Sequence, residues 1–128
     1  MSENNKRIVN EVNDALANNR VEDFLKHCSD DVVWRLVGEK STNGIKEIRD
    51  WMAQMKGAEP PKFTVDEMIA ESDSVVCRGD MTMKDQEGVE GKYSYCDFYH
   101  FKNGKIAQLD SYVIRLKPEG EGRRTANA

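Results

Sequence analysis

The chain is poor in cysteine and proline and contains no long apolar run. Its three cysteines, Cys28, Cys77 and Cys96, form no CxxC pair, a pattern that favours reduced thiols and argues against a disulfide framework or a zinc site. No apolar run approaches the roughly eighteen residues that a membrane-spanning helix needs. The N-terminal segment lacks the basic-then-apolar order of a secretory signal. We therefore expect a cytoplasmic protein without a membrane partner, a metal or another cofactor.

Positive charge is also scarce, because 19 lysines and arginines stand against 23 aspartates and glutamates, a net charge of −4 over 128 residues. This acidic balance argues against a nucleic-acid-binding surface. Apolar residues make up 38% of the chain, enough for one core without disulfides or a structural metal. We expect one domain over residues 1–117. Residues 118–128 are rich in glycine and charge and have no apolar anchor, so we expect a flexible C-terminal tail.

The first half of the chain has mainly helical periodicity. Its apolar residues recur at spacings of three and four, the pattern of a helix with one buried face. A β-branched and aromatic run before Gly38 interrupts this pattern and predicts a strand, and the polar stretch from Gly38 to Gly44 predicts a turn. The expected elements are a helix from Ser2 to the Asn18-Asn19 stop, a helix over 21–28, a strand over 31–37 and a helix over 45–55.

From Lys62 onward the apolar period changes to two, which is typical of strands. The strongest turn pattern is Asn103-Gly104, since a two-residue hairpin turn needs positive φ at both positions. The apolar parity slips near Glu67. Helices followed by an antiparallel meander predict an α+β domain. The expected strands of the meander are 63–70, 75–84, 89–102 and 106–116.

Three segments carry a resemblance to a known family. They are Phe24-Leu-Lys-His-Cys-Ser-Asp-Asp-Val-Val33, Gly44-Ile-Lys-Glu-Ile-Arg49 and Asp97-Phe-Tyr-His-Phe-Lys-Asn-Gly-Lys-Ile106. They resemble the second helix with the first strand, the third helix and the penultimate hairpin of the SnoaL-like polyketide cyclase and ketosteroid isomerase group. This group lies in the nuclear-transport-factor-2-like superfamily.

The resemblance spans residues 5 to 116 and implies a fold rather than a reaction. The implied fold is a cone-shaped, bent antiparallel sheet wrapped around three helices, a cystatin-like α+β barrel with an apolar pocket at its open end. The superfamily contains isomerases, cyclases, hydrolases, dehydratases and non-catalytic binding proteins, so the chemistry depends on the residues of the pocket.

The resemblance also places one carboxyl group in that pocket. In the isomerases, the acid four residues before the hairpin phenylalanine points inward, and Asp97 stands four residues before Phe101. Strand alternation then assigns the other positions to the inner or outer face. Asp97 is the candidate catalytic residue. The candidate substrate-binding residues are Trp34, Leu36, Met52, Met81, Met83, Tyr95, Tyr99, Leu109, Ser111 and Val113.

Burial among apolar and aromatic side chains should raise the pKa of Asp97. A modest rise would make it an acid or base near neutral pH, and a larger rise would leave it a protonated hydrogen-bond donor to a carbonyl or enolate oxygen. Steroid isomerisation is not expected, because Leu36 stands where the isomerases have their general base and Val12 stands near the position of their catalytic phenol. No arginine falls on the inner face, as the family's epoxide hydrolases would require. An aldol-type cyclisation needs only one acid and a pocket that folds the substrate.

Two functions remain open from the sequence. One is a cofactor-independent enzyme of the cyclase or isomerase type that uses Asp97 as acid or base on an apolar carbonyl compound. The other is a non-catalytic module that binds a small apolar ligand or only dimerises, with Asp97 hydrogen-bonded to its neighbours. An inward-facing second acid would favour the enzyme, and Glu67 is the only candidate. His27, late in a helix, is expected to be structural.

The outer face of the sheet is expected to be more apolar and aromatic than a solvated face. We therefore expect a homodimer that forms through this face about a two-fold axis. The residues that alternation places there are Cys96, Phe98, His100, Tyr112 and Ile114.

Overall fold

The computed structural model describes residues 2–54, 60–84 and 87–117. The expected tail over residues 118–128 lies outside the described residues, as does Met55. The helices are α1 (Ser2–Ala17), α2 (Val21–Leu25) and α3 (Gly44–Gln54). The strands are β1 (Cys28–Leu36), β2 (Lys40–Asn43), β3 (Lys62–Phe63), β4 (Glu67–Glu71), β5 (Ser74–Lys84), β6 (Glu90–Lys102) and β7 (Lys105–Arg115).

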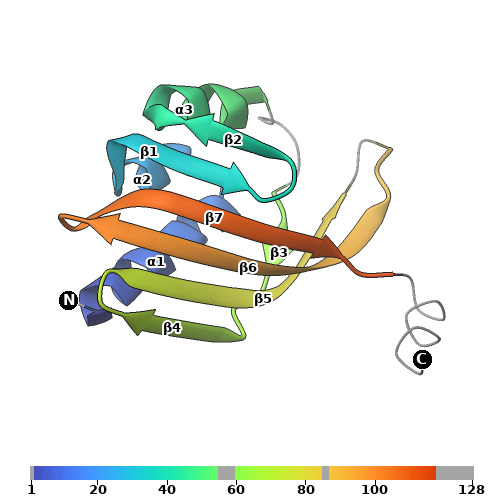
Figure 1. The fold of residues 1–128 in the computed structure, drawn as a ribbon. Coiled ribbons are helices and arrows are strands. Elements are labelled where there is room, and N and C mark those ends of the chain that lie inside the picture. The colour runs from blue at the N-terminus through green and yellow to red at the C-terminus, as the bar shows by residue number, and fades with distance from the viewer. Residues whose placement is uncertain (1, 55–59, 85–86, 118–128) are drawn as a thin grey trace.

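The strands form one bent, seven-stranded sheet in the order β2-β1-β7-β6-β5-β3, with β4 also paired to β5 (Figure 1). The α+β class is confirmed, and β4 to β7 form the expected antiparallel meander. Two details of the expectation are wrong. The sheet is mixed, because β1 pairs with β7 in parallel, and it does not close into a barrel, since β2 and β3 remain at its two edges.

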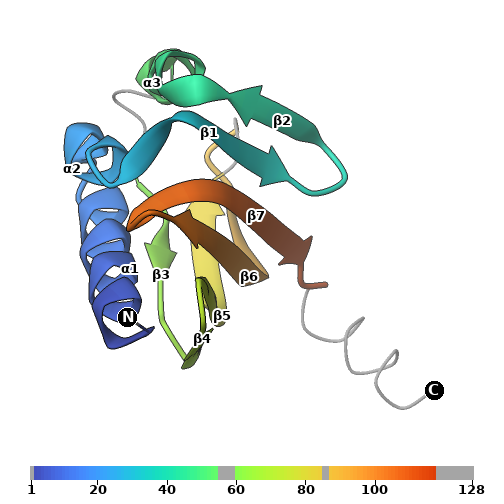
Figure 2. The same ribbon diagram turned by 60° about the vertical axis from the view of Figure 1, so that its left-hand side comes forward.

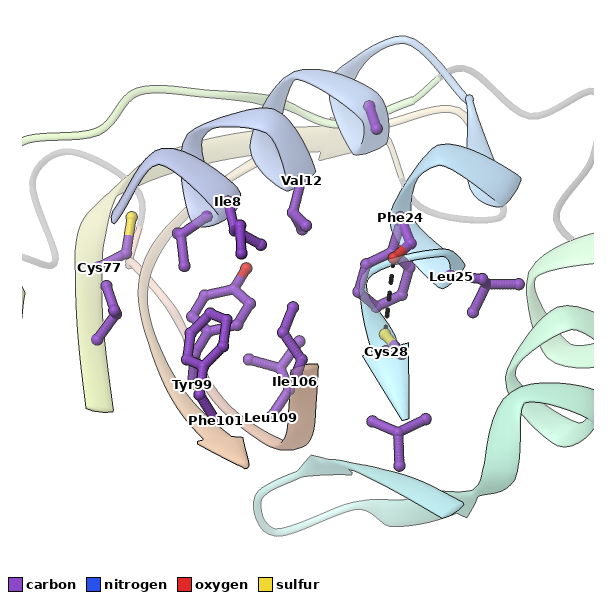
Figure 3. Packing of buried hydrophobic residues seen from close by; sticks show 14 of the residues in the cluster. Ile8, Val12, Phe24, Leu25, Cys28, Cys77, Tyr99, Phe101, Ile106 and Leu109 are labelled. Atoms are coloured by element: carbon purple, nitrogen blue, oxygen red, sulfur yellow. Dashed lines mark hydrogen bonds between the residues drawn. The ribbon is translucent and has the colours of Figure 1, made fainter. Parts of the chain in front are cut away.

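The helices lie on one side of this sheet (Figure 2). Helix α1 packs against β4 and β5, and α3 packs against β1 and β2. Between α1 and the sheet lies the hydrophobic core, whose side chains come from both layers (Figure 3). We call the sheet face that α1 covers the inner face. Within residues 2–54, 60–84 and 87–117, no helix combines the length and apolar character that crossing a membrane requires.

The largest differences from the expected element boundaries lie between α2 and α3. The second helix ends at Leu25 and β1 already begins at Cys28, where the sequence suggested helix. Strand β2 occupies part of the expected turn, because its polar residues pair with β1, as Ser41 does with Arg35. A short polar segment has no strand periodicity of its own, so only its partner defines it.

The expected strand over 63–70 is divided into β3 and β4 by a β-bulge. Phe63 pairs with Met81, whereas Glu67 pairs with Arg78, so the register changes by one residue between the two strands. The backbone N–H of Thr64 donates to the Asp80 carbonyl at 2.9 Å. This is the parity slip that the sequence placed near Glu67.

Gly79 lies opposite the bulge, on the inner face of β5. A Cβ atom at this position would lie 2.0 Å from the Thr64 carbonyl oxygen and 3.2 Å from a Tyr95 ring carbon. The bulge therefore needs a glycine here for steric reasons, since any side chain would occupy the space of the Thr64 backbone.

Candidate functional site

Asp97 lies near the middle of β6, with Cys77 of β5 on one side and Ser111 of β7 on the other. Paired residues of neighbouring strands share a face. In β1, Leu36 pairs with Ser111, and Trp34 pairs with the residue two positions before Ser111. The structure therefore places all five side chains on the inner face, where the sequence analysis had expected Asp97, Ser111, Leu36 and Trp34.

The surroundings of Asp97 change its acidity. The residue as a whole keeps some exposure to solvent, but its carboxyl group lies deep enough for burial to raise its pKa. A hydrogen bond from Ser111 acts in the opposite direction, and the net result is a pKa of about 6. A carboxyl group with this pKa exchanges a proton readily near neutral pH.

Trp34 anchors the other side of the site. Its indole Nε1 donates a hydrogen bond of 2.9 Å to the Ser111 Oγ. The ring also makes edge-to-face contacts with Phe24 and Trp51, at centroid distances of 5.5 and 5.2 Å. These contacts fix the indole plane, so the N–H group points at a defined atom.

The two candidate tyrosines are buried parts of the core. The Tyr95 hydroxyl donates to the Thr64 carbonyl oxygen at 2.6 Å and thereby ties β6 to the bulge. The Tyr99 hydroxyl is fully buried and has no hydrogen-bond partner among the described residues; its side chain lies beneath α1 (Figure 3). Burial raises the pKa of both phenols, so neither is poised to release a proton near neutral pH.

The contrast between these tyrosines gives a matched pair of variants. Tyr95→Phe leaves the Thr64 carbonyl without its side-chain donor and should lower the free energy of unfolding by about 1–2 kcal/mol. Tyr99→Phe removes a buried hydroxyl that has no partner among the described residues, so stability should stay equal or rise. Urea denaturation of both variants tests this. A larger loss in Tyr99→Phe than in Tyr95→Phe would contradict the assignment.

The remaining candidate lining residues are spread along the inner face of the sheet, except Met52, which lies on helix α3. Leu109 is buried in the core, and Met52 and Met81 pack against it. Met83 stands six positions along β5 from Cys77 and lines a separate cavity of about 10 Å³, a volume of roughly one water molecule. Val113 is 37% exposed. The structure thus gathers Asp97, Ser111, Trp34 and Leu36 closely and leaves Met83 at the far end of its strand.

One inner-face residue was missed by the sequence analysis. Cys77 is fully buried opposite Asp97, and its Sγ accepts a hydrogen bond of 3.6 Å from Asn13 of α1. Extending the alternation back from Met81 and Met83 would have placed Cys77 on this face. Burial raises the pKa of the Cys77 thiol, so it is a neutral neighbour of Asp97.

Two other candidate residues lie outside the site. The carboxylate of Glu67 is half-exposed and accepts a hydrogen bond of 2.9 Å from Arg78. The Nε2 of His27 lies 2.9 Å from the Glu11 carboxylate of α1, which fits its expected structural role. No group of three or more metal-ligating side chains occurs in the described part of the chain.

The outer face carries a buried carboxylate of a different kind. Asp110 is 6% exposed and accepts hydrogen bonds of 2.9 Å from Arg35 and of 2.9 and 3.1 Å from Gln108. Burial alone would raise the pKa of Asp110, but the hydrogen bonds from Arg35 and Gln108 outweigh it and the pKa is lowered. Asp110 is therefore a structural anion, in contrast to Asp97.

The model of the SnoaL-like domain family matches residues 9–109. The chain belongs to this family. An NTF2-like protein of unknown function from Cytophaga hutchinsonii is similar to this SnoaL-like domain at 25% identity, with a TM-score of 0.71 over 89% of this chain and 99% of the other. No curated protein matches the sequence.

Two further solved structures share the fold of this SnoaL-like domain at lower identity. An LEH-like epoxide hydrolase of M. tuberculosis has 17% identity and a TM-score of 0.78, covering 88% of this chain and 84% of its own. TerC, co-crystallised with polyporic acid, has 16% identity and a TM-score of 0.74, covering 84% of this chain and 89% of its own. These likenesses confirm the nuclear-transport-factor-2-like fold.

Proposed function

We propose that this SnoaL-like domain binds a small apolar carbonyl compound at its inner face and that Asp97 is the acid and base of a cofactor-independent, cyclase-type reaction. The observation that supports this most is a carboxyl group with a pKa of about 6 set among aromatic and apolar side chains. Its ionised form can accept a proton near neutral pH, and its protonated form can return one.

The proposed reaction is an aldol-type cyclisation within one substrate molecule. The Asp97 carboxylate takes a proton from the carbon next to a carbonyl group, and the C–H electron pair forms an enolate. The enolate carbon then attacks a second carbonyl carbon of the same molecule, which forms the ring bond and an alkoxide. Protonated Asp97 returns its proton to the alkoxide, so no other reactant is needed. Trp34 and Leu36 supply apolar surface that can hold the substrate folded.

A binding and exchange experiment tests this proposal. Polyporic acid and a panel of hydrophobic aromatic ketones are titrated against Trp51→Phe protein, in which Trp34 is the remaining tryptophan. We expect saturable changes in Trp34 fluorescence. Exchange of ketone α-protons for deuterium, followed by NMR, should be catalysed by the wild type and fall about 100-fold or more in Asp97→Asn. A flat fluorescence response across the panel would refute a ligand site.

The alternative function, a non-catalytic binding module, is favoured by one observation. Glu67, the only candidate for a second inward acid, is paired with Arg78 away from the inner face. Saturable binding together with deuterium exchange that is equal in wild type and Asp97→Asn would select this alternative.

We propose further that two copies of the chain associate through the outer face. Ile114 and Tyr112 are 65% and 43% exposed there, and a hollow of about 350 Å³ lies over β4, β5 and β6, lined in part by Ile69 and Phe98. An apolar surface of this kind favours self-association. Sedimentation should give a dimer at about 50 μM, and Ile114→Asp should weaken it. A wild-type monomer at that concentration would end this proposal.

We also propose a reducing compartment such as the cytoplasm, because Cys28, Cys77 and Cys96 are all free thiols. Cell fractionation with an antibody to the protein tests this. Recovery in an oxidising compartment would contradict it.

A further inference from the structure

A chain of two hydrogen bonds reaches Asp97 from β1 through β7. The Trp34 Nε1 lies 2.9 Å from the Ser111 Oγ. Ser111 is the direct cross-strand partner of Asp97 on β6, and its side chain acts on the Asp97 carboxyl group as a hydrogen-bond donor that lowers the pKa of that group. The three side chains come from three neighbouring strands. Trp34 and Ser111 are 77 residues apart in the sequence and meet because β1 and β7 run parallel.

The chemistry of the donors fixes the direction of these hydrogen bonds, from Trp34 to Ser111 and from Ser111 to Asp97. An indole N–H can only donate, whereas a serine hydroxyl has a single hydrogen and two acceptor lone pairs. Because Trp34 donates to the Ser111 oxygen, the Ser111 hydrogen remains for Asp97. Ser111 is only 4% exposed, so bulk water competes little for that hydrogen. A hydrogen bond to a carboxylate is stronger than one to a neutral acid, so this arrangement favours the charged form of Asp97.

The other titratable groups that interact with Asp97 are neutral when it titrates. They are Tyr95, Tyr99, Cys96 on β6 and Cys77 on β5, and burial raises the pKa of each of them. The side chain of α1 that reaches this region is the uncharged Asn13, which donates to Cys77. Ser111 is therefore the group in the described surroundings of Asp97 that opposes its burial.

We propose that Ser111 and Trp34 are positioning residues for Asp97. The indole N–H of Trp34 fixes the Ser111 hydroxyl, so that the hydroxyl hydrogen is donated to the Asp97 carboxyl group and orients it. This inference deepens the proposed function and rests on Asp97 as the acid and base. Without the side chains of Ser111 and Trp34, Asp97 remains protonated to a higher pH, so a smaller fraction of it can accept a proton near neutral pH.

The test is a titration of the Asp97 carboxyl carbon by NMR between about pH 4 and 8, without any substrate, with Asp97→Asn used to assign the resonance. The wild-type midpoint should lie at about 6. Ser111→Ala should raise it by about one pH unit, and Ser111→Thr, which keeps the hydroxyl, should restore it. Trp34→Phe should give an intermediate midpoint.

Trp51→Phe is the matched control. Trp51 packs against the Trp34 ring at a centroid distance of 5.2 Å, but its indole takes no part in the hydrogen bonds that link Trp34, Ser111 and Asp97. Its midpoint should equal that of the wild type. An unchanged midpoint in Ser111→Ala, or equal shifts in Trp34→Phe and Trp51→Phe, would overturn the inference.

A second measurement leaves Trp34 and Ser111 unchanged and compares the wild type with Asp97→Asn. The indole N–H resonance of Trp34 should move with the Asp97 midpoint, and this movement should disappear in Asp97→Asn. A Trp34 resonance that does not respond to pH would also overturn the inference. These titrations contain no substrate, so their results are independent of the ligand titrations. If no ligand binds but the Asp97 midpoint still depends on Ser111 and Trp34, only the proposed function is refuted.

Discussion

Asp97→Asn is expected to be more stable than the wild type at pH 7, by about 3 kcal/mol, and equally stable near pH 3.5. The folded-state pKa of Asp97 is raised from 3.8 to about 6, so the native state binds more protons than the unfolded state between these values. In the wild type, the contribution of Asp97 to the free energy of unfolding is fully present below pH 3.8 and is lost as the pH rises to about 6. Asparagine keeps the shape and cannot ionise, so it avoids this loss.

The measurement is the free energy of unfolding in urea at several pH values between about 3.5 and 8, for both proteins. The difference between the two curves isolates Asp97, because the other carboxyl groups are shared. Asp110→Asn is a control of opposite sign, since the lowered pKa of Asp110 adds stability above its unfolded-state pKa. If Asp97→Asn is the less stable protein at every pH, Asp97 is an ionised structural residue and the site assignment is wrong.

Gly79→Ala is expected to lower the free energy of unfolding by about 3 kcal/mol, which lowers Tm by roughly 10 °C. The added Cβ would lie 2.0 Å from the Thr64 carbonyl oxygen and 2.9 Å from its carbonyl carbon. These are backbone atoms, so relief requires the bulge to move. That movement also strains the hydrogen bond that the Thr64 carbonyl accepts from Tyr95.

Gly91→Ala is the matched control on the neighbouring strand. Gly91 is also buried, but the nearest atoms to its added Cβ, at 3.1–3.4 Å, belong to the Tyr93 side chain, which can rotate away. We expect a loss below about 1 kcal/mol in this variant. Thermal unfolding followed by circular dichroism compares the two. Equal losses in both variants would show that the bulge carbonyl does not determine the choice of glycine at position 79.

The sequence was sufficient to predict the element types and the faces of most strands, because these depend on local periodicity. The face of Ser111, for example, followed from alternation once the family resemblance had placed Asp97 on the inner face, and the structure pairs Ser111 with Asp97. The pairing of distant strands was not predictable, since no local pattern indicates that β1 runs parallel to β7. Strand β2 was missed for a similar reason, because Ser41 and its neighbours are polar and are ordered by pairing with β1.

The candidate site was predicted as a set of residues but not as a set of contacts. The family resemblance identified Asp97, strand alternation then added Trp34 and Ser111, and the contacts among the three depend on the relative stagger of three strands. Nor did the sequence distinguish the roles of Tyr95 and Tyr99, which alternate identically. Their difference arises from the bulge at Thr64, which offers a carbonyl oxygen to Tyr95.

The place of β7 in the sheet constrains the order of folding during synthesis. Strand β7 lies between β1 and β6, yet it is made after all the other strands in the described part of the chain. Until it leaves the ribosome, the unit of β1, β2 and α3 has no strand that joins it to β4, β5 and β6. Closing a contact over 77 residues, as between Trp34 and Ser111, carries a large entropic loss that slows folding. Asp97 can therefore meet Ser111, and through it Trp34, only once β7 has joined the sheet.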